Sequence, residues 1–304
     1  MNILVAGTVA IDDIKTPSST RAGLMGGSAA YAAMAASFFA PTRIVGIIGK
    51  DFPAEHINTL KQREICTEGI EHSEGDSFYW SGEYHDNMDQ RTTHAVAVNV
   101  LEAYKPKLPA SYQSSGIIVL ANMSPKNQLD VLEQCSTPQF VVADTMDIWI
   151  QTERRALDEL LTRIDMLLIN ESEAKLLTQE GNLVQAGRRL LQYGPQFAII
   201  KTGEHGALLF GPGQAFFRVG AYPLDSVEDP TGAGDSFLGG LAGHLAQAGK
   251  NVDFEALKHS LSCATVMASF TCEAFSVERL AEIDRAAIDM RLNTYAGYTQ
   301  LQGK

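Results

Sequence analysis

Short apolar runs alternate with longer amphipathic stretches along most of the chain. The runs are continuously hydrophobic, as expected for strands whose two faces are both covered by helices. Six of them have strand length: 2–7, 43–49, 116–122, 139–145, 165–170 and 196–203. Helix-length stretches lie between them, among them 125–135, 152–162 and 182–193. This order predicts an α/β fold with a doubly wound, mainly parallel sheet flanked by helices.

Residues 77–100 interrupt the alternation. Two β-rich segments flank an Asp/Asn-rich turn there, which predicts a hairpin without an intervening helix. Residues 11–16 are expected to add a strand, so that a small sheet from about 11–25 and 77–103 projects from the main domain. Such a sheet can act as a lid that closes on substrate. The alternative is a plain sheet edge or a dimer contact, and pairing of that edge would give a homodimer through the β lid.

The rest of the chain adds helices but no second domain. From residue 233 to about 292 the pattern is almost entirely helical, and the sequence contains no internal repeat, low-complexity tract or interdomain linker. We therefore predict a single α/β domain over residues 1–304, with the β lid as a discontinuous part of it.

The charge balance limits the possible partners. The 304 residues include 24 basic and 36 acidic ones, which gives a formal net charge of −12. A protein that binds the backbone of a nucleic acid needs a cationic face, so this class is disfavoured. A nucleotide remains a compatible ligand, because a few backbone N–H groups and a metal can hold it.

The sequence shows neither a targeting signal nor a membrane span. It begins MNILVAGTVAID, without a basic region, and no stretch reaches the roughly 18 consecutive apolar residues of a membrane span. The cysteines contain no CxxC pair and are interpreted as reduced thiols; they are Cys66, Cys135, Cys263 and Cys272. These features predict a cytoplasmic protein.

A glycine-rich turn precedes a helix near residue 233. The segment 228–240 reads EDPTGAGDSFLGG, and helical spacing of apolar residues continues beyond it. The first N–H groups of a helix have no partner within the helix, and together with the helix dipole they bind anions. Gly232 and Gly234 would let the backbone approach such an anion closely.

Asp235 stands beside this anion site. A carboxylate would repel an anion, so its presence is explained if Asp235 handles a proton instead. It could accept the proton of a hydroxyl that attacks a phosphoryl group held at the helix start. The backbone N–H groups would then stabilise the charge that develops during transfer. The alternative is an ordinary acidic residue in the first turn of a helix.

These residues also carry a family resemblance. The segment 229–237, DPTGAGDSF, resembles the C-terminal signature of the ribokinase-like (PfkB) carbohydrate kinases. In the expected order, 26–33 (GGSAAYAA), 170–173 (NESE) and 201–207 (KTGEHGA) are similar to further family motifs, so the resemblance covers essentially the whole chain. It implies a ribokinase-like fold and an ATP-dependent phosphotransferase that acts on an alcohol group of a small sugar or nucleoside.

The resemblance assigns roles around the glycine-rich turn. Asp235 would be the catalytic base, and the N–H groups of Gly232, Ala233 and Gly234 would form the anion hole. Asp229 would help to bind a monovalent cation, typically K⁺, or would serve only as a turn residue before a proline. The residues implied in ATP binding are Asn170, Lys201, Thr202, Gly203, Gly206 and Thr231.

Asn170 and Glu173 follow the strand-like run 165–170 directly. The carboxyl ends of strands present ligands in open α/β sheets, and the family role of this pair is to organise Mg²⁺, largely through water. Asn170 could equally cap the next helix, with Glu173 as its capping-box partner. Both roles are compatible with one another.

On the acceptor side, the resemblance implies a site at the first two motifs. Asp12 lies where family members place an acid that binds substrate hydroxyls, and Gly26 and Gly27 lie where the backbone approaches the sugar. The other substrate-side candidates are Ser28, Tyr31, Trp80, Tyr84, His85, Asp144 and Asp147.

Three positions depart from ribokinase itself. Ala10 and Tyr31 each replace an Asn, and Ser28 replaces a Lys. Buried sugar hydroxyls need polar partners, so these losses argue against ribose as the acceptor. Tyr31 is expected either to stack on a ring or base or to pack in the core.

Other nucleotide and catalytic signatures are missing from the sequence. It has no GxxxxGK[ST], no GxGxxG after 2–7, no HExxH and no GxSxG. Two functions remain: an ATP-dependent kinase, or a catalytically silent kinase-like protein that senses a nucleoside or sugar. The intact Asp235, the Gly-Ala-Gly turn and the Asn170/Glu173 pair favour the kinase.

Overall fold

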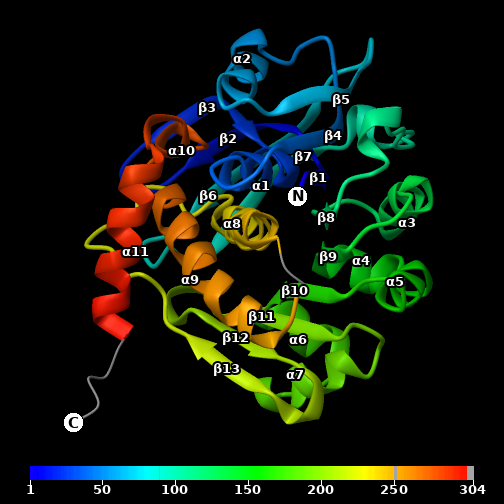
Figure 1. Ribbon diagram of the computed structural model, residues 1–304. Coiled ribbons are helices and arrows are strands. Elements are labelled where there is room, and N and C mark those ends of the chain that lie inside the picture. Colours follow the sequence, from blue (N-terminus) through cyan, green and yellow to red (C-terminus); the bar gives the residue numbers. More distant parts are fainter. Residues whose placement is uncertain (89, 250–251, 300–304) are drawn as a thin grey trace.

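The computed structural model describes residues 1–88, 90–249 and 252–299. Its centre is a nine-stranded sheet with the order β13-β12-β11-β10-β9-β8-β1-β4-β5 (Figure 1). The strands are β1 (Ile3–Ala6), β4 (Thr42–Ile48), β5 (Cys66–His72), β8 (Ile117–Leu120), β9 (Phe140–Asp144), β10 (Met166–Asn170), β11 (Phe197–Lys201), β12 (Ala207–Phe210) and β13 (Phe216–Val219). Neighbours from β5 to β11 run parallel, whereas β12 and β13 add an antiparallel edge. The predicted doubly wound, mainly parallel sheet is confirmed.

The six predicted strands, together with β5, form the parallel part of this sheet. Their continuous hydrophobicity follows from burial on both faces. In β1, Ile3 and Val5 belong to the hydrophobic cluster on one face, whereas Leu4 and Ala6 belong to the cluster on the other. Successive side chains of a strand point to opposite faces, so each face needs its own apolar residues.

Helices cover both faces of the sheet (Figure 1). The first cluster holds α1 (Ser28–Ala36), α2 (Ala54–Gln62), α8 (Ala233–Ala248) and α9 (Phe254–Thr271), with α10 (Glu278–Glu282) and α11 (Arg285–Thr299) against α9. The second holds α3 (Pro125–Gln134), α4 (Asp147–Thr152), α5 (Arg154–Leu161), α6 (Glu171–Thr178) and α7 (Leu183–Leu191). Short 3₁₀ turns are η1 (Asn99–Leu101), η2 (Ala110–Tyr112), η3 (Gly203–His205) and η4 (Pro212–Gln214). Among the residues described, no helix has the length and apolar character needed to cross a membrane.

The direction of winding reverses at β1. The chain continues from β1 to β4 and β5 on one side, and then returns to β8 on the other side. The pair β1 and β8 is therefore the topological switch point, where ligands bind in open α/β sheets. The helices α1 and α8 pack closely against one another near this point. Glycine permits the contact, since a Cβ on Gly239 of α8 would lie only 2.1 Å from the carbonyl oxygen of Ala32 in α1.

A separate four-stranded sheet has the order β3-β2-β6-β7. Its strands are β2 (Ala10–Lys15), β3 (Thr20–Gly26), β6 (Phe78–Tyr84) and β7 (Arg91–Ala97). The strands β6 and β7 are the predicted hairpin, and β2 joins β6 in parallel register. Alternate residues of β2, such as Ala10 and Asp12, are buried, so one face of this sheet is turned inward. We call this sheet the lid; the term refers to its position.

The sequence did not predict three strands and one helix break. The edge strand β5 (CTEGIEH) carries charged residues and lacks an apolar run, and β12 and β13 have four residues each. The predicted helix 152–162 corresponds to α5, and only its first residue, Thr152, belongs to α4, because Glu153 takes a non-helical conformation with φ −125° and ψ 32°. Propensity does not reveal such a break, because the local sequence remains favourable to helix.

Candidate active site

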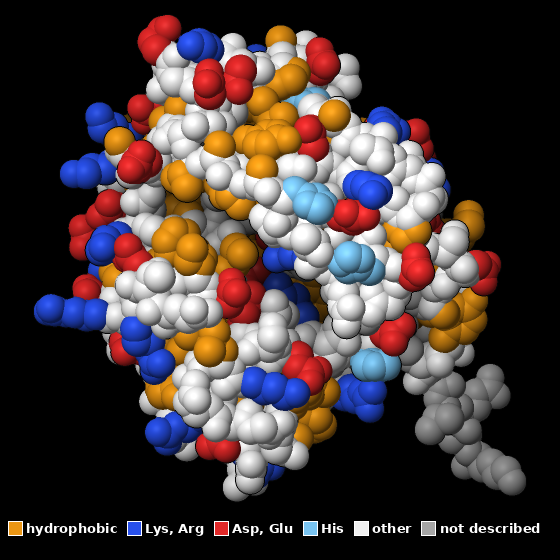
Figure 2. Space-filling view, turned by 180° about the vertical axis from the view of Figure 1, so that it is seen from behind, with side chains coloured by type: hydrophobic (Ala, Val, Ile, Leu, Met, Phe, Trp, Pro, Cys, Tyr) orange, Lys and Arg blue, Asp and Glu red, His pale blue; other side chains and the backbone are white. Residues whose placement is uncertain are grey.

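A cavity of about 1020 Å³ opens between the nine-stranded sheet and the lid. Residues at the carboxyl ends of β1, β8, β9, β10 and β11 line it, together with the first turns of α1 and α8 and the inner face of the lid. Figure 2 shows this side of the molecule hollowed near its centre, where acidic, basic and hydrophobic side chains meet. The cavity lies at the switch point, which makes it the candidate active site.

The glycine-rich turn forms one wall of the cavity. Gly232 precedes α8 with a φ of +76°, which favours glycine, and a Cβ there would lie 2.3 Å from the ring of Tyr31. The N–H of Ala233 donates to the carbonyl oxygen of Pro230 at 3.2 Å. In the part of the chain that is described, the N–H groups of Gly232 and Gly234 have no protein acceptor. The turn thus leaves two backbone donors available to an anion.

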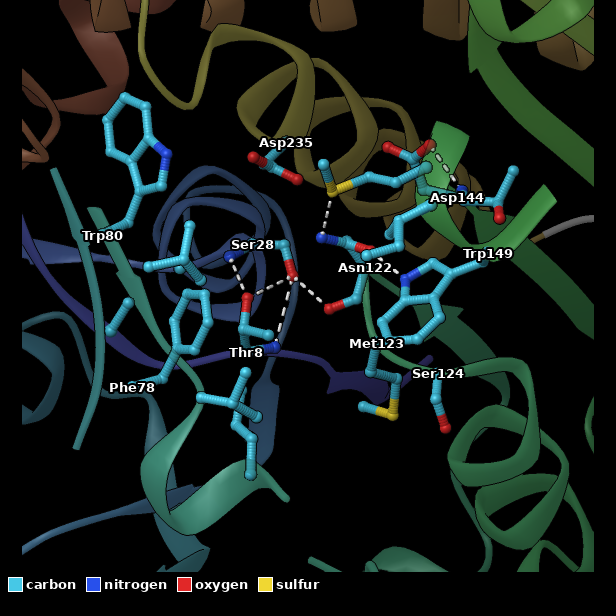
Figure 3. Close-up of a pocket in the computed structure, with 18 of the residues that line it drawn as sticks. Thr8, Ser28, Phe78, Trp80, Asn122, Met123, Ser124, Asp144, Trp149 and Asp235 are labelled. Atoms are coloured by element: carbon cyan, nitrogen blue, oxygen red, sulfur yellow. Dashed lines mark hydrogen bonds between the residues drawn. The ribbon is translucent and has the colours of Figure 1, made fainter. Parts of the chain in front are cut away.

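Asp235 lies in the first turn of α8 and borders the cavity (Figure 3). Burial and the negative charge of Asp144 raise the pKa of the Asp235 carboxyl to about 7, although the charges of Lys201 and Arg91 act in the opposite direction. A carboxyl group that titrates near neutral pH can both accept and release a proton there. The structure therefore places such a carboxyl group in the same turn as the two N–H groups that lack a protein acceptor.

Lys201 connects the turn with the nucleotide-side residues. Its Nζ lies 3.0 Å from Oδ2 of Asp144, and the two side chains are only 18% and 8% exposed. A Cβ on Gly234 would lie 3.1 Å from the same Nζ, so the ammonium group is next to the anion site. Burial disfavours the ammonium, but the charges of Asp144, Glu173 and Asp235 outweigh this effect and raise the pKa of Lys201. The cation is thus held in place by the carboxylates around it.

Asn170 and Glu173 form the predicted capping box of α6. The Oδ1 of Asn170 accepts the N–H of Glu173 at 2.9 Å, and Oε2 of Glu173 accepts the N–H of Asn170 at 2.8 Å. Burial and the charge of Asp144 raise the pKa of Glu173 to about 7. Both residues of the pair border the cavity, so capping leaves them beside the space where a ligand would bind.

The donor set fits a hydrated Mg²⁺. The carboxylates of Asp144 and Glu173 provide hard oxygen atoms at the cavity. Among the described residues, no three His, Cys, Asp or Glu side chains form a ready-made metal shell. Mg²⁺ normally keeps several waters and takes further ligands from phosphates, so one or two carboxylates are enough.

Asp229 is fully buried and ties two segments together. Its Oδ1 accepts the N–H of Thr231 at 2.9 Å, and its Oδ2 accepts the N–H of Ser276 at 3.4 Å. The hydroxyl of Ser276 donates to the carbonyl oxygen of Met25 at 2.5 Å, next to the Gly-Gly motif. The Thr231 hydroxyl donates to the Tyr84 hydroxyl at 3.2 Å, which joins the turn to the lid. The turn role of Asp229 is thus evident in the structure.

Asp12 lies on the inner face of the lid and is 4% exposed. Burial raises its pKa to about 8, and the charges of Asp229, Asp235 and Asp13 add to the effect. A Cβ on Gly26 would lie 2.0 Å from Oδ2 of Asp12, so the glycine makes room for this carboxyl group. At neutral pH the carboxyl is largely protonated and can donate a hydrogen bond.

The start of α1 is fixed by a small polar network at the cavity floor (Figure 3). The Ser28 N–H donates to Oγ1 of Thr8 at 3.0 Å, and the Ser28 hydroxyl donates to the carbonyl oxygen of Asn122 at 3.1 Å. Gly27, with φ +93°, passes so close to Thr8 that a Cβ would lie 2.4 Å from its carbonyl oxygen. Tyr31 is 1% exposed and packs beneath Gly232, which places it in the core at the cavity floor.

Several predicted residues lie outside the cavity lining that the structure describes. Thr202, Gly203 and Gly206 form the turn between β11 and β12, where the Thr202 N–H donates to the Gly206 carbonyl oxygen at 2.8 Å. The ring of His85 lies 2.9 Å from Oγ1 of Thr92, away from the cavity. Gly26, Asp229 and Ala233 also lie outside the described lining. The remaining substrate-side candidates border the cavity: Asp12, Gly27, Ser28, Tyr31, Trp80, Tyr84, Asp144 and Asp147.

Sequence reasoning missed several lining residues. Arg91 on the lid, Asn122 after β8 and Trp149 on α4 all border the cavity. Asn122 ends one of the predicted strands, and a polar residue at a strand's carboxyl end was an available signal. Trp149 ends the segment DTMDIW (144–149), which was expected to line the site through Asp144 and Asp147. Nothing in the sequence alone marked Arg91, because its place depends on how the lid folds over the sheet.

The turn before α8 therefore combines Asp235 with two N–H groups that lack a protein acceptor among the described residues, and Lys201 lies beside it at the switch-point cavity. The family model described as pfkB family carbohydrate kinase matches residues 3–283. The chain belongs to this family, and the predicted resemblance and fold are confirmed. It is therefore a carbohydrate or nucleoside kinase, an enzyme class that uses ATP and Mg²⁺.

Individual relatives agree with this assignment. The chain is 28% identical over 252 residues to the cytidine kinase of Thermococcus kodakarensis, covering 80% of this chain and 88% of that one. The solved nucleoside kinase of Burkholderia thailandensis in complex with inosine superimposes with a TM-score of 0.78 at 19% identity, covering 97% and 98% of the two chains. A putative ribokinase II of E. coli in complex with ATP and Mg²⁺ gives a TM-score of 0.78 at 16% identity, covering 96% and 99%.

Proposed function

We propose that Asp235 is the base that activates the acceptor hydroxyl for phosphoryl transfer from ATP. The observation that carries this proposal is the position of Asp235 in the first turn of α8, beside the two N–H groups without a protein acceptor and within the cavity. The acceptor proton passes to the carboxylate as the acceptor oxygen bonds to the γ-phosphorus, and the bond to the leaving ADP oxygen breaks. The N–H groups of Gly232 and Gly234 stabilise the transferred group, and Ala233 keeps the turn closed.

The nucleotide side is assigned to the region around Lys201. Its ammonium group lies beside Gly234 and would face the phosphates of a bound ATP. Asn170 and Thr231 border the cavity, and Thr202, Gly203 and Gly206 form the adjoining turn that would contact the rest of the nucleotide. Mg²⁺ would be held by Glu173 and Asn170 through water, and it would neutralise phosphate charge. A K⁺ near Asp229 would stabilise the turn from behind.

The acceptor side is assigned to the inner face of the lid. Asp12 is proposed to bind an acceptor hydroxyl, with Gly27 and Ser28 at the floor and Gly26 leaving room for the Asp12 carboxyl group. Similarity to a cytidine kinase and to an inosine-bound nucleoside kinase supports a sugar or nucleoside as the acceptor. Asp144 is engaged by Lys201, which favours a place next to the phosphates over direct contact with the acceptor.

The experiment that tests this function measures ADP formation by the purified protein. ATP, Mg²⁺ and a panel of sugars and nucleosides are supplied, and at least one acceptor should be phosphorylated. Binding of an acceptor without turnover would instead support a silent sensor. The intact Asp235, Lys201 and glycine turn favour catalysis.

Two further assignments concern the state of the protein in the cell. All four cysteines are unpaired, which supports a location in the reducing cytoplasm.

The edge strands β3 and β7 leave the lid available for pairing with a second copy, which we propose as the surface of a homodimer. Sedimentation velocity measures this directly, and a monomer at all concentrations would refute it.

The pH dependence of kcat/KM should report Asp235. The charged groups that act on it are Asp144, Lys201 and Arg91, and their balance with burial raises the Asp235 pKa to about 7. A base must be ionised to accept a proton, so kcat/KM should rise with pH and level off above about 7. Below that value it should fall about tenfold per pH unit. A flat profile between about pH 6 and 8 would contradict the role of Asp235 as the base.

A further inference from the structure

Both tryptophans of the chain border the same cavity. Trp80 lies on β6 of the lid, and Trp149 lies on α4 above the carboxyl end of β9. Figure 3 labels Trp80 with Phe78 on the lid side, and Trp149 with Met123 on the side of the main sheet. Large flat side chains at a cavity provide apolar area and a surface on which planar rings stack.

The ring of Trp80 is held against the lid. A Cβ on Gly82 would lie 2.2 Å from the indole, so the ring lies over the glycine. Its Nε1 donates to Oγ1 of Thr93 at 3.3 Å, and the guanidinium carbon of Arg91 lies 5.8 Å from the ring centroid. These contacts restrict the side chain of Trp80 to few rotamers before any ligand binds. Less conformational entropy is therefore lost on binding.

Trp149 is fixed by a second set of contacts. Its Nε1 donates to Oδ1 of Asn122 at 2.8 Å, and the Asn122 amide donates to the sulfur of Met146 at 2.7 Å. The carbonyl oxygen of Asn122 accepts the Ser28 hydroxyl, so the ring is linked to the floor of the acceptor site. The polar atom of the indole is satisfied within the protein, and its apolar surface remains for a ligand.

The wall between the two tryptophans is apolar. Six further side chains contribute to it: Phe78, Val96, Val98, Leu101, Met123 and Ile148. Val96, Val98 and Ile148 are 54%, 48% and 49% exposed, although large hydrophobic residues are normally buried. Exposed apolar side chains that gather at one cavity indicate a ligand surface. We call this wall the apolar chamber.

We propose that the acceptor is a nucleoside whose heterocyclic base occupies the apolar chamber, while its sugar lies between Asp12 and Asp235. This inference rests on the proposed function for the position of the reacting hydroxyl. A free sugar carries hydroxyl groups all around its ring, and the apolar chamber would leave them without partners. The heterocyclic base of a nucleoside buries its two flat faces against such a wall, and its polar atoms lie at its edge. Ser124 and Asn127 also border the cavity and offer polar groups to that edge.

Tryptophan fluorescence tests the proposal without depending on catalysis. Because Trp80 and Trp149 both border the cavity, binding of cytidine, uridine, adenosine or inosine should quench the intrinsic emission. Ribose and fructose, titrated over the same range, should leave it unchanged. The variants Trp80→Phe and Trp149→Phe each keep one indole, so they show which ring the base contacts, and the retained phenyl ring should preserve much of the affinity.

A pair of valine variants provides the matched control. Val96→Asp places a charge in the apolar chamber and should raise the Kd for the nucleoside at least tenfold. Val184→Asp makes the same change on α7, where valine is 38% exposed and away from the cavity, and should leave the Kd unchanged. Both sites are exposed, so neither variant should fail to fold. Equal effects of the two variants would overturn the proposal.

The outcomes separate this inference from the proposed function. Quenching by nucleosides without ADP formation would support the apolar chamber as a base site and refute the kinase mechanism. ADP formation with free sugars alone, together with no quenching by nucleosides, would overturn the nucleoside proposal and keep the mechanism. Quenching and phosphorylation of the same nucleoside would support both.

Discussion

Replacing Asp235 with asparagine is expected to lower kcat by about 10²–10⁴-fold, the usual contribution of a general base. The amide keeps the size of the side chain but accepts no proton from the acceptor hydroxyl. Since Lys201 and the glycine turn remain in place, the affinity for ATP should change little. Single-turnover phosphorylation and ATP binding, measured on the same preparation, separate the two effects.

The control for this variant is Asp225→Asn, at an exposed acid on the loop before α8. It should retain wild-type kcat.

Stability offers a second check on Asp235. Its pKa in the folded protein is raised to about 7, so the ionised carboxylate lowers the stability of the fold at higher pH. The Asp235→Asn variant should therefore gain stability over the wild type at pH values above 7 but not in acid. Wild-type turnover by Asp235→Asn would rule out the base assignment.

Lys201→Met is expected to reduce the free energy of unfolding by about 3 kcal/mol. The ammonium lies 3.0 Å from the Asp144 carboxylate, and both side chains are largely buried. Removing the cation leaves a buried carboxylate without its partner, beside the acidic groups of Glu173 and Asp235. Activity should fall as well, because the cation next to Gly234 would no longer face the phosphates. Denaturation in urea, followed by circular dichroism, measures the loss of stability.

A double variant tests the physical cause. Lys201→Met combined with Asp144→Leu removes both charges, and should recover most of the stability lost by Lys201→Met alone. The comparison is Lys175→Met, which breaks the exposed pair with Glu171 and should cost at most about 1 kcal/mol. If Lys201→Met costs no more than Lys175→Met, the buried pair does not stabilise the fold as argued.

The parallel sheet was predictable because both of its faces are covered. Alternate residues of a strand such as Ile3–Ala6 enter different clusters, which makes the whole run apolar. The turn at Gly232 and the helix after it were also predictable, since the glycines and the apolar spacing lie within one short segment. Such features can be predicted because the residues that determine them are neighbours in the sequence.

Contacts between distant segments were not predictable in the same way. The ion pair of Lys201 with Asp144 joins residues 57 positions apart, and the Trp149–Asn122 hydrogen bond joins residues 27 apart. The sequence shows which residue types are present, but it does not show which distant residues lie close together in the fold. The edge strand β5 was missed for another reason: it is largely exposed and needs few apolar residues.

The contacts of Ser276 bear on the order in which the site can form during translation. Among the described residues, all those that border the cavity precede Ser276 in the chain, from Thr8 to Asp235. Yet Ser276 holds both Asp229, before the glycine turn, and Met25, before the Gly-Gly motif. During translation, every described cavity residue is thus synthesised before Ser276, which joins the segment before the Gly-Gly motif to the glycine-rich turn. A nascent chain that ends before Ser276 carries the chemistry of the enzyme without the geometry that aligns it.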